Sequence, residues 1–266
     1  MTRKILIIGA GELGLSLIKA ITSHPSRPTV SVLLRPSSKT KLSSYAVEVI
    51  LGDVLAPLSE LAKLFRGYDI VISATGFAGG PGSQIHLAKA ALEAEVPHYF
   101  PWQFGVDYDT IGKGSSQPLF DEQLDVRALL RSQSLTKWTI VSTGLFTSFL
   151  FEPSFGVVDL HKGVVNALGS WNNAVTLTSA EDIGYLTSRI ALDEETPPEG
   201  VVFIAGDTVT FEDVAKEIEK KGWQGLIWSK NIGVSWSKEQ SWNGKKGIKT
   251  ESLSQWVDQN LPAPYR

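Results

Sequence analysis

The sequence contains no cysteine and only one methionine among its 266 residues. The missing cysteine excludes a thiolate nucleophile, a disulfide and a cysteine-ligated metal. The four histidines are scattered without the short spacings typical of a metal site, so we expect no bound metal. The sequence therefore argues against thiol chemistry and against a metal centre.

The chain also lacks a strong charge of either sign, because 25 Lys and Arg residues face 28 Asp and Glu residues. The formal net charge of −3 gives no electrostatic basis for binding nucleic acid or an anionic membrane. No apolar segment is long enough to predict a membrane span, and glycines break the N-terminal apolar run before it resembles a signal peptide. We expect a cytoplasmic protein, monomeric or homodimeric, whose partner is a small-molecule substrate.

A further absence concerns catalysis. No tyrosine is followed four residues later by lysine. Ordinary short-chain reductases use such a Tyr-x-x-x-Lys pair, in which the lysine lowers the pKa of the proton-donating tyrosine. Tyr185 has Arg189 at this spacing, on a predicted helix away from the expected site. The sequence therefore argues against the ordinary short-chain reductase mechanism.

What the sequence does contain is a glycine-rich corner near its N-terminus. The apolar run 5–8 has the length and β-branching of a buried parallel strand, and Gly9, Gly11 and Gly14 then spell G-x-G-x-x-G before a helical segment. In a dinucleotide-binding corner the first glycine permits the tight turn, the second lets a pyrophosphate approach the backbone, and the third lets the helix pack on the strand. The helix start would offer its N–H groups to the phosphates. A tight corner without a ligand is the alternative.

Apolar segments alternate with helical segments through the first 150 residues. This alternation predicts a doubly wound parallel sheet of the Rossmann type, in the α/β class. Right-handed crossovers would place the carboxyl ends of the strands along one rim, where ligands bind. We expect an NAD(P)-binding domain over 1–150. The predicted strands cover 5–8, 29–34, 46–51, 68–76, 96–100 and 137–142.

Beyond residue 150 the pattern loosens. We expect a smaller substrate-binding lobe over 151–266, partly interleaved with the sheet. Its predicted strands cover 164–167, 175–177 and 201–204, and its predicted helices cover 179–192, 211–220 and 251–259.

The residue after the second strand indicates which cofactor fits. An acidic residue there would bind the ribose of NAD, whereas an arginine accommodates the 2′-phosphate of NADP. Arg35 holds this position and favours NADPH, the alternative being an exposed arginine without a ligand. The other predicted cofactor contacts follow the glycine corner, Arg35 and the strand ends: Glu12, Leu13, Ser37, Lys41, Asp53, Val54, Ala74, Thr75, Gly76, Phe77, Pro101, Trp102 and Gln103.

These features resemble the isoflavone reductase and phenylcoumaran benzylic ether reductase family, also called NmrA-like proteins, which are atypical short-chain dehydrogenase/reductases. The resemblance depends on the glycine corner, the arginine after the second strand, the strand ends 52–53 and 73–76, and the segment 100–105, which is similar to the family's F-P-S-E-F-G. The segments 101–109 and 119–133 resemble fungal members, several of which act in secondary metabolism.

The resemblance implies an NADPH-binding Rossmann domain, a smaller C-terminal lobe and a substrate cleft between them. It also implies reduction of an aromatic or polyketide-like molecule, with a catalytic lysine four residues before Arg127. That position holds Gln123, which orients groups by hydrogen bonds but has no ionisable proton. Tyr108 and Asp107, after the fifth strand, are our candidates for supplying the proton. Candidate substrate contacts are Trp102, Phe104, Phe146 and Phe149.

Two further positions depart from the family pattern. Ile8 stands where the family's G-x-x-G-x-x-G has its first glycine, and Trp102 and Gln103 replace its Ser-Glu pair. We predict an NADPH-dependent reductase of a hydrophobic, aromatic small molecule. Because Gln123 replaces the lysine, a cofactor-binding redox sensor without turnover is the alternative. A non-redox isomerase or cyclase on the same scaffold is a lesser one.

Overall fold

The structure is a computed structural model that describes residues 2–77, 79–115, 117–194, 196–221, 226–229 and 235–261, with the backbone alone at 226–229. The chain divides into two compact units, each of which is discontinuous in sequence. The first comprises Met1–Gln103, Tyr108–Val141 and Ile183–Val202, and the second comprises Phe104–Asp107, Ser142–Asp182 and Phe203–Arg266. The first unit therefore takes chain from both sides of residue 150.

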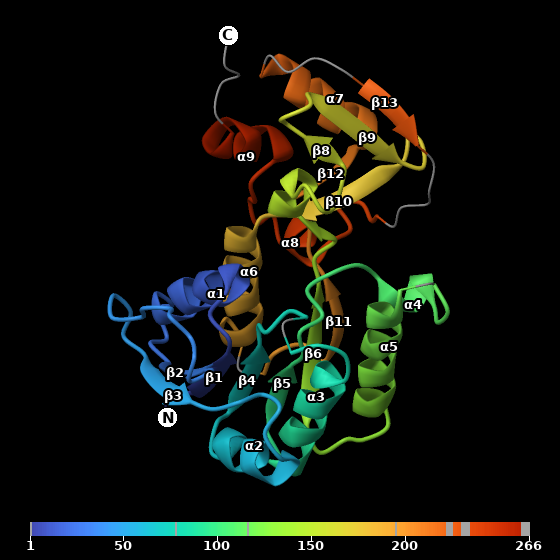
Figure 1. Cartoon of the computed structure of the whole chain (residues 1–266). Helices are drawn as coiled ribbons and strands as arrows, with labels where there is room; N and C mark the ends of the chain where they lie inside the picture. The colour runs from blue at the N-terminus through green and yellow to red at the C-terminus, as the bar shows by residue number, and fades with distance from the viewer. Residues whose placement is uncertain are drawn as a thin grey trace. The chain divides into compact units, whose positions relative to one another are not determined.

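A parallel sheet organises the first unit (Figure 1). Within the described residues it has seven strands in the order β11-β6-β5-β4-β1-β2-β3. The chain passes from β1 outward to β2 and β3, and then returns to the other side of β1 for β4, β5 and β6. This reversal is the switch point at which doubly wound sheets bind ligands. The strands are β1 (Lys4–Ile8), β2 (Thr29–Leu34), β3 (Glu48–Leu51), β4 (Ile70–Ser73), β5 (His98–Phe100), β6 (Lys137–Ser142) and β11 (Gly200–Phe203).

Helices cover both faces of this sheet, which confirms the predicted doubly wound α/β fold (Figure 1). On one face α3 packs between α2 and α5, and on the other α1 lies beside α6. A Cβ added to Gly184 of α6 would lie 2.6 Å from the carbonyl carbon of Ser16 in α1, so glycine permits this close contact. The helices are α1 (Glu12–Thr22), α2 (Leu58–Phe65), α3 (Ser83–Glu93), α4 (Tyr108–Ile111), α5 (Pro118–Arg131) and α6 (Ala180–Leu192).

The core of the first unit explains the apolar runs of its central strands. Ile5, Leu6, Ile7 and Ile8 of β1 are all fully buried. A strand covered by helices on both faces cannot alternate between apolar and polar side chains, because neither face reaches water. The continuous apolar run therefore fixes β1 in the middle of the sheet and brings its carboxyl end, with the glycine corner, to the switch point.

The second unit contains smaller sheets and short helices. Among its described residues, β10 pairs with β7 and β12, and β9 pairs with β8 and β13. Phe211 and Val214 of α7 belong to an apolar cluster with Trp171, and a capping box between Thr210 and Asp213 begins this helix. The elements are β7 (Leu145–Phe146), η1 (Thr147–Phe151), β8 (Val158–Asp159), β9 (Val164–Leu168), β10 (Ala174–Thr178), β12 (Asp207–Thr210), α7 (Phe211–Lys220), β13 (Leu226–Ser229), α8 (Trp242–Lys245) and α9 (Leu253–Asn260).

Candidate functional site

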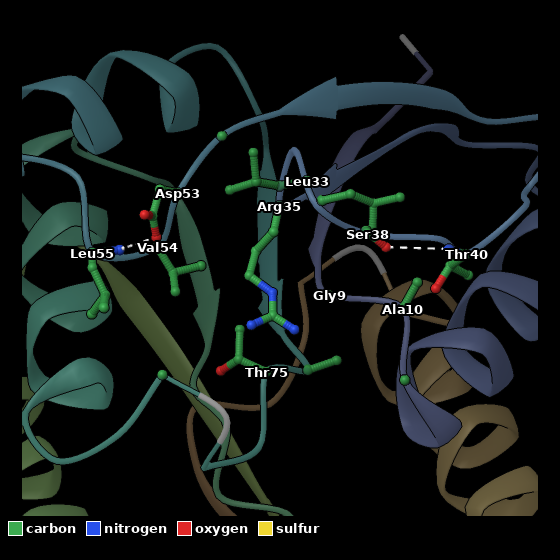
Figure 2. Close-up of a pocket in the computed structure, with 15 residues that line it drawn as sticks. Gly9, Ala10, Leu33, Arg35, Ser38, Thr40, Asp53, Val54, Leu55 and Thr75 are labelled. Carbon is green, nitrogen blue, oxygen red and sulfur yellow. Dashed lines mark hydrogen bonds between the residues drawn. The ribbon is translucent and has the colours of Figure 1, made fainter.

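A cavity of about 400 Å³ lies at the carboxyl ends of the strands around β1, entirely within the first unit (Figure 2). The loops that follow β1, β2, β3 and β4 all contribute to it. Its position matches the switch point at which ligands bind to doubly wound sheets. The lining residues are Gly9, Ala10, Gly11, Leu33, Leu34, Arg35, Ser38, Thr40, Gly52, Asp53, Val54, Leu55, Ala74, Thr75 and Gly79.

The three glycines of the corner have different surroundings. Gly9 has a φ of +96°, and a Cβ there would lie 3.1 Å from the carbonyl oxygen of Ala74. A Cβ on Gly14 would lie only 2.3 Å from the carbonyl oxygen of Gly9, so α1 packs against the corner itself. A Cβ on Gly11 would meet no described atom within 4 Å. Two glycines therefore serve the fold, whereas Gly11 leaves open space beside the cavity, where a ligand approaches a dinucleotide-binding corner.

The beginning of α1 adds hydrogen-bond donors to this corner. Gly11 precedes the helix, and no side chain among the described residues caps its start. The first N–H groups of a helix lack intrahelical partners, and they lie at the positive end of the helix dipole. This arrangement suits an anionic group.

Arg35 provides a positive charge in the same cavity. Figure 2 shows its side chain extending from the end of β2 toward Thr75. The guanidinium has no ion-pair partner among the residues that the structure describes. Because a guanidinium keeps its charge at any pH the protein experiences, an anionic ligand would find an uncompensated cation here.

A turn after Arg35 decides which neighbouring side chains reach the cavity. The N–H of Ser38 donates to the carbonyl oxygen of Arg35 over 2.9 Å, with Pro36 and Ser37 in the middle of the turn. Ser38 and Thr40 therefore line the cavity, whereas Ser37 and Lys41, which the sequence indicated, are exposed and do not. Proline at the second position is a known signal for this turn, so Ser38 was accessible to prediction.

The cavity unites seven of the predicted cofactor residues. They are Gly9, Gly11, Arg35, Asp53, Val54, Ala74 and Thr75. The predicted contacts that do not line it are Glu12, Leu13, Gly14, Ser37, Lys41, Gly76, Phe77, Pro101, Trp102 and Gln103. The residues that sequence analysis missed are Ala10, Leu33, Leu34, Ser38, Thr40, Gly52, Leu55 and Gly79.

Local packing explains why several predicted contacts lie elsewhere. Leu13 and Gly14 are buried against the sheet. Phe77 and Trp102 contact each other edge to face, with their ring centres 4.4 Å apart. Both atoms of the Gln103 amide are occupied inside the protein, so this side chain is not available to a ligand.

Gln103 belongs to a polar cluster, the Arg127 network, which consists of Gln103, Asp109, Gln123, Arg127 and Arg131. Gln103, Gln123 and Arg127 are buried, whereas Asp109 and Arg131 are exposed. Gln103 donates from Nε2 to the backbone oxygen of Gln123 over 2.8 Å, and it accepts from Nε of Arg127 over 2.7 Å. Arg127 and Arg131 both bind the carboxylate of Asp109 over 2.6 Å. The hydrogen bond from Arg131, assisted by Arg127, lowers the pKa of Asp109 to about 2.

Gln123 is the exception in this network. Its side chain is fully buried, and neither Nε2 nor Oε1 has a hydrogen-bond partner among the described residues. An unpaired buried amide has a free-energy cost of about 1–3 kcal/mol.

The two proton-donor candidates sit at the start of α4. The ring of Tyr108 is buried between Phe120, at a ring-centre distance of 5.2 Å, and the guanidinium carbon of Arg127, 5.3 Å from its ring centre. Burial raises the pKa of Tyr108 to about 12, so its hydroxyl stays protonated. Asp107 is half-buried, and its role stays a prediction.

The candidate substrate contacts are distributed between the two units. Trp102 belongs to the first unit, and Phe104, Phe146 and Phe149 belong to the second. Phe104 is buried, whereas Phe149 is 48% exposed and contacts both Phe146 and Phe155 edge to face, at ring-centre distances of 6.4 and 6.2 Å. Phe149 thus presents an aromatic surface to solvent within the second unit.

Two features are absent from the residues that the structure describes. No helix in this part of the chain combines the length and apolarity needed to cross a bilayer. No group of three His, Asp or Glu side chains there is arranged to hold a metal ion.

Comparisons with known proteins identify the family. The model of the NmrA-like family matches residues 1–236, and the chain belongs to this family. An NmrA-like family domain-containing oxidoreductase of Gibberella moniliformis is 40% identical, over 98% of this chain and 99% of its own length. The phenylcoumaran benzylic ether reductase Betv6 of Betula pendula is 27% identical, over 82% of this chain and 74% of its own length.

Among solved structures, the NADPH-dependent quinone oxidoreductase QOR2 of Escherichia coli, complexed with NADPH, has a similar fold. The TM-score is 0.76 with 16% identity, and the match covers 96% of this chain and 99% of the other. At this identity the likeness concerns the fold. It agrees with the Rossmann-type architecture built above from the strand order and the glycine corner.

Proposed function

We propose that the protein is an NADPH-dependent reductase. The observation that carries this proposal is the uncompensated guanidinium of Arg35 in a cavity whose other side is the glycine corner. The start of α1 and Gly11 would bind the pyrophosphate, and Arg35 with Ser38 would bind the 2′-phosphate. The carboxylate of Asp53, at the far side of the cavity, would accept a hydrogen bond from the adenine amine.

The fit of this cofactor is supported by shape as well as charge. Gly11 leaves free space where a side chain would otherwise stand, and no described side chain competes for the N–H groups of α1. Bound NADPH would supply a hydride. The chain's own part would be to hold the dinucleotide, orient the substrate and exclude water, which accounts for much of the rate enhancement in such reactions.

The substrate we propose is a hydrophobic, aromatic small molecule. The relative from Betula pendula is named for reducing a benzylic ether, and the exposed ring of Phe149 offers an aromatic surface. Tyr108 and Asp107 stay our proton-donor candidates from their place after β5. Burial raises the pKa of Tyr108 to about 12, which makes its hydroxyl a weaker acid than a free tyrosine. A role in secondary metabolism and a cytoplasmic location stay predictions.

Calorimetric titration with NADPH, NADH and their oxidised forms tests the proposal. We expect NADPH to bind at least tenfold more tightly than NADH, as one charge-assisted phosphate contact allows. Turnover is then tested by following NADPH oxidation with a panel of carbonyl, quinone and enone compounds. Absence of NADPH binding would refute the proposed cofactor, and binding without any turnover would refute the proposed reductase.

A redox sensor without turnover is the second candidate, and Gln123 is the observation that favours it. At the position where the resemblance implies a catalytic lysine, this chain has a buried amide with no hydrogen-bond partner among the described residues. A sensor would bind NADPH and NADP⁺ with distinct affinities and would oxidise none of the panel compounds. A demonstrated turnover would exclude it.

A further inference from the structure

Two side chains of α3 hold the corner that follows β4. Ser83 donates from Oγ to the backbone oxygen of Gly80 over 2.7 Å, and Gln84 holds the end nearest the cavity. Gln84, in the first turn of α3, is 3% exposed. Its Nε2 donates to the backbone oxygen of Gly76 over 2.6 Å and to the hydroxyl of Thr75 over 3.1 Å. Thr75 lines the cavity, so the amide group of Gln84 holds one lining residue through a hydrogen bond without lining the cavity itself.

This corner has little rigidity of its own. Gly76, Gly80 and Gly82 all adopt positive φ, the region that glycine enters without strain. Glycine loses more conformational freedom on ordering than any other residue, so such a segment stays in one conformation only when other groups fix it. At the end nearest the cavity, the two hydrogen bonds of Gln84 supply that restraint together with a 3.3 Å hydrogen bond between the hydroxyls of Ser73 and Thr75.

Gln84 is itself fixed by a residue of α5. The carboxylate of Glu122 accepts from the backbone N–H groups of Gly82, Gln84 and Ile85, over 2.9, 2.8 and 3.2 Å. A carboxylate at a helix start satisfies N–H groups that have no partner within the helix, and it complements the helix dipole. Glu122 therefore holds the first turn of α3 and sets where Gln84 projects.

We propose that Gln84 is a positioning residue for the cofactor-binding cavity, and that Glu122 acts on the cavity through Gln84. The inference rests on the proposed function, because it concerns the same cavity. It extends that function to two residues that do not themselves line the cavity. Glu122 precedes Gln123 in α5, so the proposal also links this helix to the cavity wall at Thr75, which would face the cofactor.

The first experiment compares Gln84→Leu with a matched control, Gln133→Leu. Gln133 braces the loop between α5 and β6 in the same way, since its Nε2 donates to the backbone oxygens of Leu130 and Thr136. That loop lies at the amino end of β6, whereas the cavity lies at the carboxyl ends of the strands. Gln133→Leu loses three hydrogen bonds, since Oε1 of Gln133 also accepts from the N–H of Thr136, whereas Gln84→Leu loses two. The control should therefore lose at least as much stability as Gln84→Leu.

NADPH binding should separate the two variants. We expect Gln84→Leu to raise the Kd for NADPH about tenfold, because the Thr75 corner is no longer held in its binding position. Gln133→Leu should leave the Kd unchanged. Equal affinities for Gln84→Leu and the native protein, or equal weakening by both variants, would overturn the proposal.

A double-mutant cycle tests the route from Glu122. Glu122→Gln keeps the shape but weakens the charge-assisted bonds to the α3 start, and we expect a rise in Kd of about threefold to fivefold. If Glu122 acts through Gln84, the double variant binds NADPH no more weakly than Gln84→Leu alone. Additive losses would mean that the two residues act separately, which contradicts the proposal.

Hydrogen exchange in the free protein separates this inference from the proposed function. Without any cofactor, Gln84→Leu should exchange faster at the amides of Thr75, Gly76 and Phe77, and Gln133→Leu should not. If the native protein bound no nicotinamide nucleotide, the proposed function would fail while this exchange still reported the bracing. Unchanged exchange in Gln84→Leu would overturn the bracing even if NADPH bound tightly.

Discussion

The cavity beside β1 and the Arg127 network lie in the same unit, but their arginines differ in exposure and in ion pairing. In the cavity the guanidinium of Arg35 is exposed and has no ion-pair partner among the described residues. In the network the guanidinium of Arg127 is fully buried and is paired with Asp109. The first cation is available to a ligand, whereas the second is used within the fold. Residue type alone therefore says little about which arginine has a binding role.

The two regions also differ in which polar groups lack hydrogen-bond partners among the described residues. The cavity has open space at Gly11 and uncapped N–H groups at α1, which are features that a bound anion would satisfy. The network has a single defect, the unpaired amide of Gln123. The cavity thus has room and donors for an anionic group, whereas the buried part of the network is filled by the protein's own side chains.

Gln123→Lys should have the largest effect on stability. The new ammonium would be buried one helical turn from Arg127, without a carboxylate of its own. An uncompensated buried charge typically costs about 3–5 kcal/mol of unfolding free energy, which urea denaturation measures. Gln259→Lys on the exposed side of α9 is the control and should change stability by less than about 0.5 kcal/mol.

A second substitution sharpens this result. Gln103→Glu would place a carboxylate beside Arg127 and the Gln123 backbone. In the Gln123→Lys background it should recover part of the lost stability, because the two new charges compensate each other. A Gln123→Lys variant as stable as the native protein would show that water or a partner reaches this position, contrary to a closed network.

Comparing Gly14→Ala with Gly11→Ala distinguishes a glycine needed for packing from one needed for ligand binding. At Gly14 the new methyl group would meet the Gly9 carbonyl at 2.3 Å, and overpacking of this kind costs about 1–3 kcal/mol. At Gly11 it would meet no described atom within 4 Å, so stability should change by less than about 1 kcal/mol.

NADPH titration completes that comparison. Gly11→Ala should weaken NADPH at least about tenfold while the fold stays intact, because its methyl group would occupy the space proposed for the pyrophosphate. Native-like NADPH affinity in Gly11→Ala would place the pyrophosphate somewhere else. A Gly14→Ala variant of native stability would contradict the close packing of α1 on the corner.

Arg35→Asp tests the unpaired cation directly. We expect NADPH binding to weaken by about 1–3 kcal/mol, the scale of a lost charge-assisted contact, while NADH binding is spared. Arg66→Asp, at an exposed position after α2, is the control and should leave both affinities unchanged. Equal weakening of NADPH and NADH by Arg35→Asp would mean that Arg35 does not recognise the 2′-phosphate.

The pH dependence of the Arg127 network should be the smallest effect. The pKa of Asp109 is about 2 in the folded protein and near 3.8 when the chain is unfolded, so its ion pairs stabilise the fold above about pH 4 and are lost as pH falls toward 2. Because its side chain is 38% exposed, solvent screening should keep the contribution below about 1 kcal/mol. The stability difference between native protein and Asp109→Asn should shrink between pH 4.5 and 3, and a constant difference would contradict this assignment.

The sequence predicted the larger elements well because each carries its own periodicity. The predicted strands 29–34 and 137–142 and the predicted helix 211–220 have the bounds of β2, β6 and α7. Short elements were missed, including β7 and β12, which both pair with β10. β7 has only two residues and β12 contains a single apolar side chain, Val209, so neither carries a pattern that predicts a strand. Both form because β10 supplies their hydrogen bonds.

The site was predictable to a similar degree. Local backbone geometry and the place after a strand pointed to Gly9, Gly11 and Arg35, and all three line the cavity. Their contacts with a cofactor stay predictions. Ser37 was preferred to Ser38 because the turn that orients this loop was not recognised. Gln84 could not be found at all, since its role depends on contacts with Gly76 and with Glu122, 38 residues away.

The sequence by itself determined the doubly wound sheet, the glycine corner and the cation after β2, because apolar periodicity and backbone sterics act between near neighbours. Only the tertiary structure decided which loop side chains line the cavity, that 183–202 returns to the first unit, and that the amide of Gln123 is buried with no partner among the described residues. Those outcomes depend on residues that meet only after the chain has folded. Their burial and hydrogen bonding cannot be calculated from local pattern.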